Sequence, residues 1–414
     1  MLVNNKNIVN NKNIVNNKNI VNNKNIRKES ICPVCKSSNT DVFLEIPDVP
    51  VHCNLLWETS DDALNAPRSD IILVLCEDCE HIFNCAFDPR LMEYTQQYEN
   101  SLHFSQIFQG YAKELADRLI ETYNLHGKSI IEIGCGKGDF LKLLCKTGKN
   151  RGVGFDSSYE NVGETPCPDP EITFIKDFYS QRYLNYRADF ICCRQVLEHI
   201  ESPVDFLTDI RKMIGDNHTI VFFEVPNVDY TLKDLGIWDL IYEHRSFFSK
   251  RSLAYLFASC GFSIFALNDS YNGQFLFIEA IACTSQSCRK TDYESNMKLL
   301  LDQFVRKFHT KIRTWKKEIK TVEKSGQKIV LWGAGSKGVT FLNMIGAKKQ
   351  IEYVIDINPR KQGKYIPGTG QKICSPEFLR EYQPDKIIIM NAIYKNEIQQ
   401  IMNGLGVSAQ LIFV

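Results

Sequence analysis

Apolar and polar positions alternate along the middle of the chain in an order that predicts strands and helices in turn. Between residues 129 and 281, short apolar runs are separated by stretches with helical spacing. This order is typical of a largely parallel sheet that helices cover on both faces. Seven runs are predicted strands: Ser129–Ile133, Arg151–Phe155, Ile172–Ile175, Ala188–Cys193, Thr219–Val225, Ser263–Asn268 and Gln274–Cys283.

The segments on either side of this alternation have patterns of their own. The first repeats the hexapeptide Val-Asn-Asn-Lys-Asn-Ile four times, and its small apolar area predicts a disordered tail. Next comes a cysteine-rich segment with strand-like runs at Asp41–Ile46 and Ile71–Leu75. Leu91 to Leu125 is predicted to be mostly helical. The predicted units are a tail, a cysteine-rich module, a central α/β domain, a linking helix and a smaller C-terminal α/β domain: residues 1–29, 30–90, 91–283, 284–324 and 325–414.

Composition narrows the class of protein. The chain has 414 residues, of which 44% are hydrophobic, and this length predicts two or three domains in an ordinary soluble protein. Forty-nine basic residues balance 49 acidic ones, so no overall field attracts nucleic acid or an anionic membrane. Neither a membrane-spanning apolar run nor a signal-peptide core is visible. With 15 cysteines, these features favour a reducing compartment, and we expect the cytoplasm.

Two Cys-x-x-Cys pairs indicate a metal site. Cys32 and Cys35 form the first pair and Cys76 and Cys79 the second, and four thiolates complete a tetrahedral zinc site. Such a zinc is structural, because no coordination position stays open for a substrate. Redox dithiols and unrelated buried cysteines are the alternatives. Three nearby residues are spare ligands: His52, Cys53 and His81. Cys85 is predicted to be core.

A glycine-rich turn follows the first strand of the central domain. Gly134, Gly136 and Gly138 occupy every second position between the strand and a helix, so that the backbone can approach a ligand closely. The spacing differs from the Gly-x-Gly-x-x-Gly of dinucleotide binders. With Glu132, the pattern Glu-x-Gly-x-Gly-x-Gly resembles motif I of the class I S-adenosylmethionine-dependent methyltransferases. A glycine turn in an unrelated α/β protein is the alternative.

Polar residues at the ends of the next strands suit the same ligand. Asp156 ends the second strand, where its carboxylate can accept bonds from two ribose hydroxyls. Asp177 and Phe178 follow the third strand, and in the methyltransferase family such a pair contacts the adenine. The fourth strand continues into Gln195 and then Val-Leu-Glu-His, which resembles small-molecule methyltransferases. The His199 of this run is more often structural than catalytic.

A charged loop precedes the predicted helix Ser249–Cys260. It contains Tyr242, Glu243, His244 and Arg245, and such a group is costly to bury without a function. Histidine is well suited to remove a proton near neutral pH, and a neighbouring carboxylate can orient it. A polar network at the helix entry is the alternative.

The C-terminal unit has a glycine turn of its own. Gly333, Gly335 and Gly338 follow a predicted strand, and Asp356 ends the next strand. This is a dinucleotide fingerprint in its usual context, and by itself it favours an NAD-dependent dehydrogenase.

The order of these parts resembles the nucleotide-sugar C-methyltransferases. That family has an N-terminal zinc-binding domain, a seven-stranded Rossmann-like methyltransferase domain and a smaller Rossmann-like C-terminal domain. The resemblance implies zinc ligands Cys32, Cys35, Cys76 and Cys79. It implies S-adenosylmethionine contacts at Glu132, Gly134, Gly136, Gly138, Asp156, Asp177, Phe178 and Gln195. It implies a base and its surroundings at His244, Glu243, Tyr98, Asn227 and Tyr242.

In that family the substrate is a nucleotide-linked keto sugar, and the C-terminal glycines need no NAD. We therefore expect His244 to remove a proton next to the ketone, with Glu243 orienting it. Tyr98, Asn227, Tyr242 and Arg245 would then hold the enolate oxygen. The loop departs from the family pattern at Tyr242, where the family commonly has histidine, and at Phe247, which lacks a hydroxyl. O- or N-methylation of another small molecule is the alternative reaction.

Overall fold

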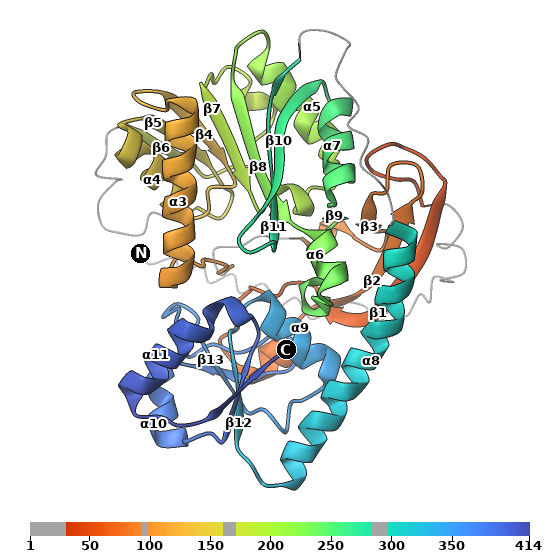
Figure 1. The fold of residues 1–414 in the computed structure, drawn as a ribbon, viewed down its shortest axis with the longest axis vertical. Coiled ribbons are helices and arrows are strands. Elements are labelled where there is room, and N and C mark those ends of the chain that lie inside the picture. The colour runs from red at the N-terminus through yellow and green to blue at the C-terminus, as the bar shows by residue number, and fades with distance from the viewer. Residues whose placement is uncertain (1–29, 93–97, 160–170, 284–296) are drawn as a thin grey trace, which may run out of the picture.

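The computed structural model describes residues 30–92, 98–159, 171–283 and 297–414. The hexapeptide tail and the first part of the predicted linking helix lie outside these residues. Figure 1 shows a central α/β domain and a C-terminal α/β domain, with the N-terminal module beside both of them.

The central domain is built on a seven-stranded sheet in the order β10-β11-β8-β7-β4-β5-β6. Strand β11 is antiparallel to both β8 and β10, and the other pairs are parallel. The strands are β4 (Ser129–Ile133), β5 (Arg151–Phe155), β6 (Ile172–Ile175), β7 (Phe190–Arg194), β8 (Ile220–Pro226), β10 (Phe262–Ser270) and β11 (Phe275–Ala282). The order reverses between β4 and β7, which makes this point the topological switch of the sheet.

Both faces of this sheet are covered by helices. Alternate residues of β7 point to opposite faces: Phe190 and Cys192 pack with helices α3 and α4, whereas Ile191 and Cys193 pack with α5 and α7. Continuous apolar strands follow from this double burial. The helices are α3 (Gln106–Tyr123), α4 (Asp139–Gly148), α5 (Pro203–Ile214), α6 (Val228–Lys233) and α7 (Lys250–Ser259).

The N-terminal module is a small antiparallel sheet that is completed by a distant part of the chain. Strands β1 (Thr40–Pro50), β2 (Arg68–Cys76) and β3 (Ile82–Asn84) pair in order, and α2 (Ser60–Leu64) lies in the β1–β2 connection. The fourth strand, β9 (Ser246–Phe247), belongs to the charged loop of the central domain and pairs with β3. The predicted boundary at residue 90 therefore places three strands of this sheet in the N-terminal module and leaves the fourth, β9, in the central domain.

The C-terminal domain is a parallel five-stranded sheet in the order β14-β13-β12-β15-β16. The strands are β12 (Ile329–Trp332), β13 (Tyr353–Ile355), β14 (Lys372–Cys374), β15 (Lys386–Ile389) and β16 (Gln410–Phe413). The helices are α9 (Ser336–Ile345), α10 (Leu379–Tyr382) and α11 (Lys395–Leu405). The predicted linking helix is α8 (Met297–Lys324), which runs from the N-terminal module to the C-terminal domain (Figure 1).

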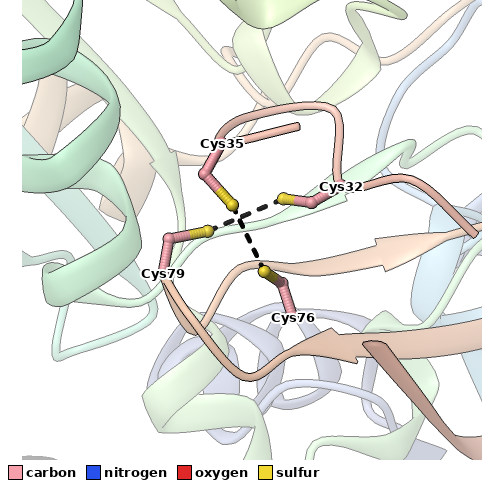
Figure 2. A group of neighbouring side chains, drawn as sticks. All are labelled: Cys32, Cys35, Cys76 and Cys79. Carbon is pink, nitrogen blue, oxygen red and sulfur yellow. Dashed lines mark hydrogen bonds between the residues drawn. The ribbon is translucent and has the colours of Figure 1, made fainter. Parts of the chain in front are cut away.

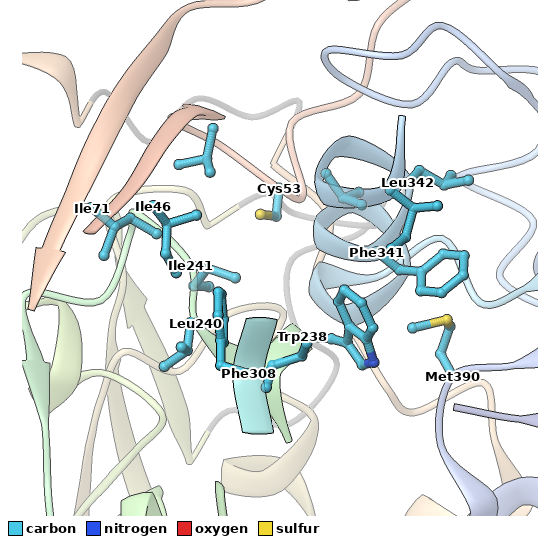
Figure 3. Packing of buried hydrophobic residues seen from close by; sticks show 14 of the residues in the cluster. Ile46, Cys53, Ile71, Trp238, Leu240, Ile241, Phe308, Phe341, Leu342 and Met390 are labelled. Atoms are coloured by element: carbon cyan, nitrogen blue, oxygen red, sulfur yellow. The ribbon is translucent and has the colours of Figure 1, made fainter. Parts of the chain in front are cut away.

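One hydrophobic core joins the three parts. Ile46 and Ile71 of the N-terminal module, Trp238 of the central domain, Phe308 of α8 and Phe341 of α9 belong to the same buried cluster (Figure 3). The indole of Trp238 packs edge-on against Phe341, with ring centroids 4.9 Å apart. Because this core is shared, the N-terminal module and the C-terminal domain are held in a defined position against the central domain.

The predicted helix from Leu91 to Leu125 begins later than its apolar spacing suggested. Helix α3 starts at Gln106, where the hydroxyl of Ser105 accepts a bond from the Phe108 N–H at 3.3 Å. Residues 98–105 form an irregular segment, and Tyr98 makes an isolated bridge to Leu55 of the N-terminal module. At residues 98–105, tertiary contact with that module therefore replaces the predicted helix, and residues 93–97 lie outside the described part of the chain.

Among the described residues, no helix is long and apolar enough to span a membrane.

Candidate functional site

A cavity of about 780 Å³ lies between the central and C-terminal domains. Its wall includes residues that follow β4, β5 and β7 on one side and β12, β13 and β15 on the other. The carboxyl ends of two parallel sheets therefore meet at one space, and ligands of open α/β sheets bind at such ends. The volume lies in the upper part of the range of about 300–1,000 Å³ that ligand sites occupy. It offers room for a cofactor and a substrate together.

The glycine turn after β4 forms one wall of this cavity. Gly134, Gly136 and Gly138 all have positive φ, at 73°, 55° and 79°. A side chain at Gly134 would meet Val196 Cγ2 at 2.1 Å, and one at Gly138 would meet the Phe174 ring at 2.4 Å. At Gly136 nothing lies within 4 Å, so this residue faces open cavity. The first and third glycines thus keep the turn compact, and the second gives a ligand room to approach.

The predicted ribose contact lies beside this turn. Asp156 accepts bonds from the Gly136 N–H and the Ser158 N–H, both at 2.8 Å, and it lines the cavity. Asp177, Phe178 and Gln195 line the same cavity. Phe178 is 61% exposed, so its ring has a free face. Gln195 has a φ of 56°, which turns the chain sharply at the end of β7.

Asp177 already has protein partners. Its Oδ2 accepts a bond from the Tyr183 hydroxyl at 2.5 Å and pairs with the Arg182 guanidinium. The hydrogen bond from the Tyr183 hydroxyl is the main cause that lowers the pKa of Asp177 below its ordinary value, and the Arg182 guanidinium lowers it further. The carboxylate therefore stays ionised and can accept a further bond from a ligand amino group.

His244 lines the cavity and lies against a second histidine. The rings of His244 and His199 are 5.0 Å apart in an edge-on arrangement. The Nδ1 of His199 lies 3.0 Å from the backbone oxygen of Glu243, which favours a proton on Nδ1, and its Nε2 lies 3.9 Å from the Glu198 carboxylate. Burial, helped by the neighbouring His199, lowers the pKa of His244 well below its ordinary value. His244 is therefore a neutral imidazole near pH 7.

Glu198 is a residue of this group that the sequence analysis did not select. Possible ligand atoms of Glu198, His199 and His244 all lie within 4.8 Å of one another. Burial raises the pKa of Glu198 to about 8. The sequence could have indicated Glu198 only through its place beside His199 in the Val-Leu-Glu-His run. Its proximity to His244 results from long-range folding, which helical or strand spacing does not indicate.

The other residues of the charged loop point away from the cavity. The Tyr242 hydroxyl accepts a bond from the Asp88 N–H at 2.7 Å and donates one to the Ala86 carbonyl at 3.2 Å. The Arg245 guanidinium donates to the Asn84 carbonyl and stacks over Phe83. These bonds hold both side chains against the N-terminal module, so the expected enolate contacts of Tyr242 and Arg245 are not supported.

Glu243 and Asn227 also differ from their expected placement. The Glu243 carboxylate lies 3.4 Å from His52 Nδ1 and accepts a bond from the Cys53 N–H at 3.3 Å, so it faces the N-terminal module instead of orienting His244. Asn227 caps α6 by accepting from the Asp229 N–H at 3.0 Å, and its amide donates to the Gly273 carbonyl at 2.9 Å. Of the predicted substrate contacts, Tyr98 lines the cavity together with His244.

The loop that carries His244 is thus built onto the N-terminal module. Its strand β9 pairs with β3, and the Ser246 hydroxyl lies 3.1 Å from His81 Nε2. The Asn84 N–H donates to the Arg245 carbonyl at 3.0 Å. Together with the bonds of Tyr242 and Glu243 described above, these contacts flank His244 on both sides, so the position of the imidazole depends on the fold of the module.

The four predicted zinc ligands come together in this module. Figure 2 shows their sulfur atoms pointing toward one another, with Cys32 and Cys79 3.6 Å apart and Cys35 and Cys76 3.4 Å apart. A tetrahedral zinc with Zn–S bonds of about 2.3 Å places its sulfurs roughly 3.8 Å apart. The donor set and its spacing fit that metal. His52, Cys53 and His81 make other contacts and are not part of the cluster.

The two cysteine turns have the same backbone geometry. The Lys36 N–H donates to the Cys32 carbonyl at 3.1 Å, and the Glu80 N–H donates to the Cys76 carbonyl at 2.9 Å. Lys36 and Glu80 both adopt left-handed conformations, with φ of 63° and 58°. A left-handed residue right after each pair closes the turn and directs two sulfurs to one point. Such paired turns favour metal binding over redox dithiols, which usually open a helix.

The C-terminal glycine turn shares one bonding pattern with the first one, although only Gly333 of its three glycines has a positive φ. Asp356 accepts bonds from the Ala334 N–H and the Asn358 N–H, both at 2.8 Å, much as Asp156 does in the central domain. Here, however, Lys361 donates to the Ala334 carbonyl at 3.1 Å and to the Asn54 side chain at 3.4 Å. A buried lysine and a residue of the N-terminal module thus occupy the space beside this turn.

Comparison with known proteins agrees with the fold. Residues 104–267 match a family described as a methyltransferase domain, and residues 284–413 match one described as a C-methyltransferase C-terminal domain. The C-methyltransferase NovU of Streptomyces niveus is 24% identical over 395 residues, which is 90% of this chain and 92% of NovU. The ubiquinone biosynthesis O-methyltransferase of Proteus mirabilis is 26% identical over 121 residues, which is 27% of this chain and 45% of that protein.

Solved structures resemble part of the chain. Magnesium protoporphyrin IX methyltransferase from Synechocystis PCC 6803, solved with bound SAH, is 17% identical and has a TM-score of 0.34. The similarity covers 42% of this chain and 84% of that one. The [4+2]-cyclase SpnF is 13% identical with a TM-score of 0.34, over 43% of this chain and 83% of that one.

The sheet order, the glycine turn and the matched domain together define the class. The chain is a methyltransferase with the class I α/β fold and a second α/β domain at its C-terminal end. More particularly, that second domain matches the C-terminal domain of C-methyltransferases.

Proposed function

We propose that this protein transfers a methyl group from S-adenosylmethionine to a carbon of a nucleotide-linked keto sugar. The observation that carries the proposal is a neutral, buried His244 in the same cavity as the glycine turn. A base is needed for carbon methylation in particular, because a sugar carbon becomes nucleophilic only after it loses a proton next to a ketone. Over most of its length the chain is similar to NovU, which is described as a C-methyltransferase.

In this mechanism His244 removes the proton next to the ketone. Its low pKa keeps the imidazole unprotonated and able to accept the proton near pH 7. The neighbouring His199, whose Nδ1 is held by the Glu243 carbonyl, disfavours a proton on His244 before the substrate binds. Tyr98 lines the cavity with His244, and in this mechanism its hydroxyl donates to the enolate oxygen. S-adenosylmethionine supplies the electrophilic methyl group on its sulfonium.

The glycine turn and the ends of β5 and β6 hold the cofactor. Asp156 accepts from the ribose hydroxyls, and Asp177 with Phe178 contacts the adenine. Gly136 leaves space for the cofactor to lie along the turn. The nucleotide end of the substrate would reach the opposite wall, where Lys337 and Asn391 of the C-terminal domain donate to Gln274 of the central domain. Four thiolates hold one structural zinc in the N-terminal module.

A glycine pair separates cofactor binding from folding. Gly134→Ala is expected to destabilise the unliganded protein strongly, because the new methyl would meet Val196 and φ is positive. Gly136→Ala should cost only roughly 1–2 kcal/mol of stability, which is the usual penalty for a left-handed alanine. It should nevertheless weaken S-adenosylmethionine binding, because the methyl enters the cavity. Thermal unfolding without ligand and calorimetric titration measure the two effects. Equal effects of both variants on both measurements would contradict the assigned roles.

Ligand-induced stabilisation tests the cofactor. At 100 times its dissociation constant, S-adenosylmethionine should stabilise the protein by about 2.7 kcal/mol, whereas NAD should leave the unfolding temperature unchanged. Stabilisation by NAD alone would favour a dehydrogenase with Gly333, Gly335, Gly338 and Asp356 as its site. With keto nucleotide sugars and labelled cofactor, NMR of the product then distinguishes a methyl on carbon from one on oxygen or nitrogen.

A further inference from the structure

Arg194 is a buried cation in the wall of the cavity to which the proposed function gives no role. It is the last residue of β7, beside β4 at the switch point of the sheet. Its side chain is only 9% exposed. The guanidinium lies 4.2 Å from the centroid of the Phe140 ring and 6.0 Å from that of Tyr111, so α4 and α3 enclose it. The residue nevertheless lines the cavity, together with Glu132 and Gly134.

The protein satisfies one side of this guanidinium. Nε and Nη2 donate to the same oxygen of Glu224, at 3.2 and 3.1 Å. The other Glu224 oxygen accepts from the Tyr111 hydroxyl. Among the described residues, no protein group accepts a bond from the third nitrogen, Nη1. A fork with one unused edge in a ligand cavity is suited to a planar anion such as a carboxylate.

Glu132 does not supply that anion. Its carboxylate is close enough to influence Arg194, but burial raises the pKa of Glu132 to about 8. The Oε2 atom of Glu132 is buried and has no hydrogen-bond partner among the described residues. Each side chain therefore keeps one atom that can still form a hydrogen bond: Nη1 of Arg194 can donate, and Oε2 of Glu132 can accept.

We propose that Arg194 binds the α-carboxylate of the cofactor's amino-acid tail. This inference rests on the proposed use of S-adenosylmethionine. In the proposed function the adenosyl end of the cofactor lies at Asp156 and Asp177, which follow β5 and β6. From there, a cofactor that passes along the Gly134–Gly138 turn extends toward β7, on the other side of β4. The amino-acid tail then ends beside Arg194, and its ammonium group lies near the Glu132 oxygen. Arg194 is thus a specificity-determining residue for a cofactor that carries a carboxylate.

The alternative is that Arg194 only neutralises Glu224 in the core. Binding of two cofactors that differ in a single group separates these roles: S-adenosylmethionine and its decarboxylated form, S-adenosyl-3-methylthiopropylamine. A hydrogen bond to a charged group contributes about 1.5–3 kcal/mol, so the wild-type protein should bind the decarboxylated form roughly 10- to 150-fold more weakly. Arg194→Met should bind S-adenosylmethionine more weakly by a similar factor and should no longer distinguish the two.

Arg118→Met is a matched control for the loss of a partly buried arginine. Arg118 also pairs with a buried glutamate, Glu279 at 2.7 Å, and stacks over Phe277, but it does not line the cavity. This variant should keep the wild-type preference. If Arg194→Met fails to fold, the double variant Arg194→Met with Glu224→Gln removes the unpaired carboxylate and is compared instead.

Each result of the calorimetric titrations has a defined meaning. Equal affinity of the wild-type protein for both cofactors would overturn the inference about Arg194 while leaving the cofactor assignment in place. An equal loss of affinity for both cofactors in the variant would show that Arg194 acts only through the fold, which also overturns it. Failure of the wild-type protein to bind either compound would instead contradict the proposed function.

Discussion

Replacing His244 by alanine should abolish proton removal from the substrate and, with it, methyl transfer. A lost general base typically lowers the rate by about 10²–10⁴-fold. Without a methyl donor, the wild-type protein should exchange the hydrogen next to the ketone for solvent deuterium, and His244→Ala should not. NMR of a keto nucleotide sugar in D₂O measures this step separately from methylation.

Two comparisons make this result specific to the base. His126→Ala removes an exposed histidine and should exchange like the wild-type protein. Cofactor affinity of His244→Ala should stay close to wild type, since the glycine turn lies on other elements, although the loss of a buried ring is expected to lower the thermal unfolding midpoint. If the folded His244→Ala protein exchanges and methylates at near wild-type rates, another residue is the base.

The same residue determines how the reaction depends on pH. An unperturbed histidine begins to protonate as the pH falls through about 6.5. Burial and His199 lower the pKa of His244 well below that value, so the imidazole remains a competent base at lower pH. We therefore expect kcat/KM for methylation to persist as the pH falls through 6.5 and to decline only in more acidic solution. A decline centred at pH 6.5 or above would mean that His244 is not buried as described or is not the base.

Local sequence patterns were sufficient to predict the central sheet and its glycine turn. Strands β4, β5 and β6 have the predicted bounds, because each is a short apolar run between polar turns. Gly134, Gly136 and Gly138 could be assigned because all three have positive φ, and close packing also excludes a side chain at Gly134 and Gly138. The four cysteines were likewise identifiable from spacing alone. In each case the pattern that allowed the prediction spans only a few residues, although the two cysteine pairs meet only in the fold.

The side-chain positions inside the candidate site could not be predicted, because they depend on contacts between residues that are far apart in the sequence. Tyr242 and Arg245 were expected at the substrate, yet their polar atoms bond backbone groups near Asn84 and Ala86. Sequence spacing cannot indicate that β9 would pair with β3. Arg194 was not selected for a similar reason: only the packing of α3 and α4 encloses its guanidinium in the wall of the cavity.

The N-terminal module holds the loop that carries His244. We therefore expect the removal of zinc to cause the second large loss of activity. Purified protein should contain about one zinc per chain, by the four-thiolate argument. Structural zinc contributes apparent binding free energies of about 10–16 kcal/mol in zinc-finger peptides, so a module of this size should lose its fold without metal. Cys76 is the last residue of β2 and Cys79 lies between β2 and β3, the strand that pairs with the His244 loop.

Chelation of the wild-type protein, or Cys76→Ser, should therefore reduce methyl transfer by at least as much as His244→Ala. S-adenosylmethionine should still bind, because the glycine turn belongs to the central sheet. Hydrogen exchange should increase in β1, β2, β3 and β9 and remain low in β4 and β7. Cys85→Ser, which alters a cysteine outside the cluster, should keep both zinc and activity. A zinc-free protein that is folded and fully active would refute the metal assignment. A metal-free protein that loses exchange protection in β1–β3 but keeps its activity would instead show that the His244 loop holds its position without the module.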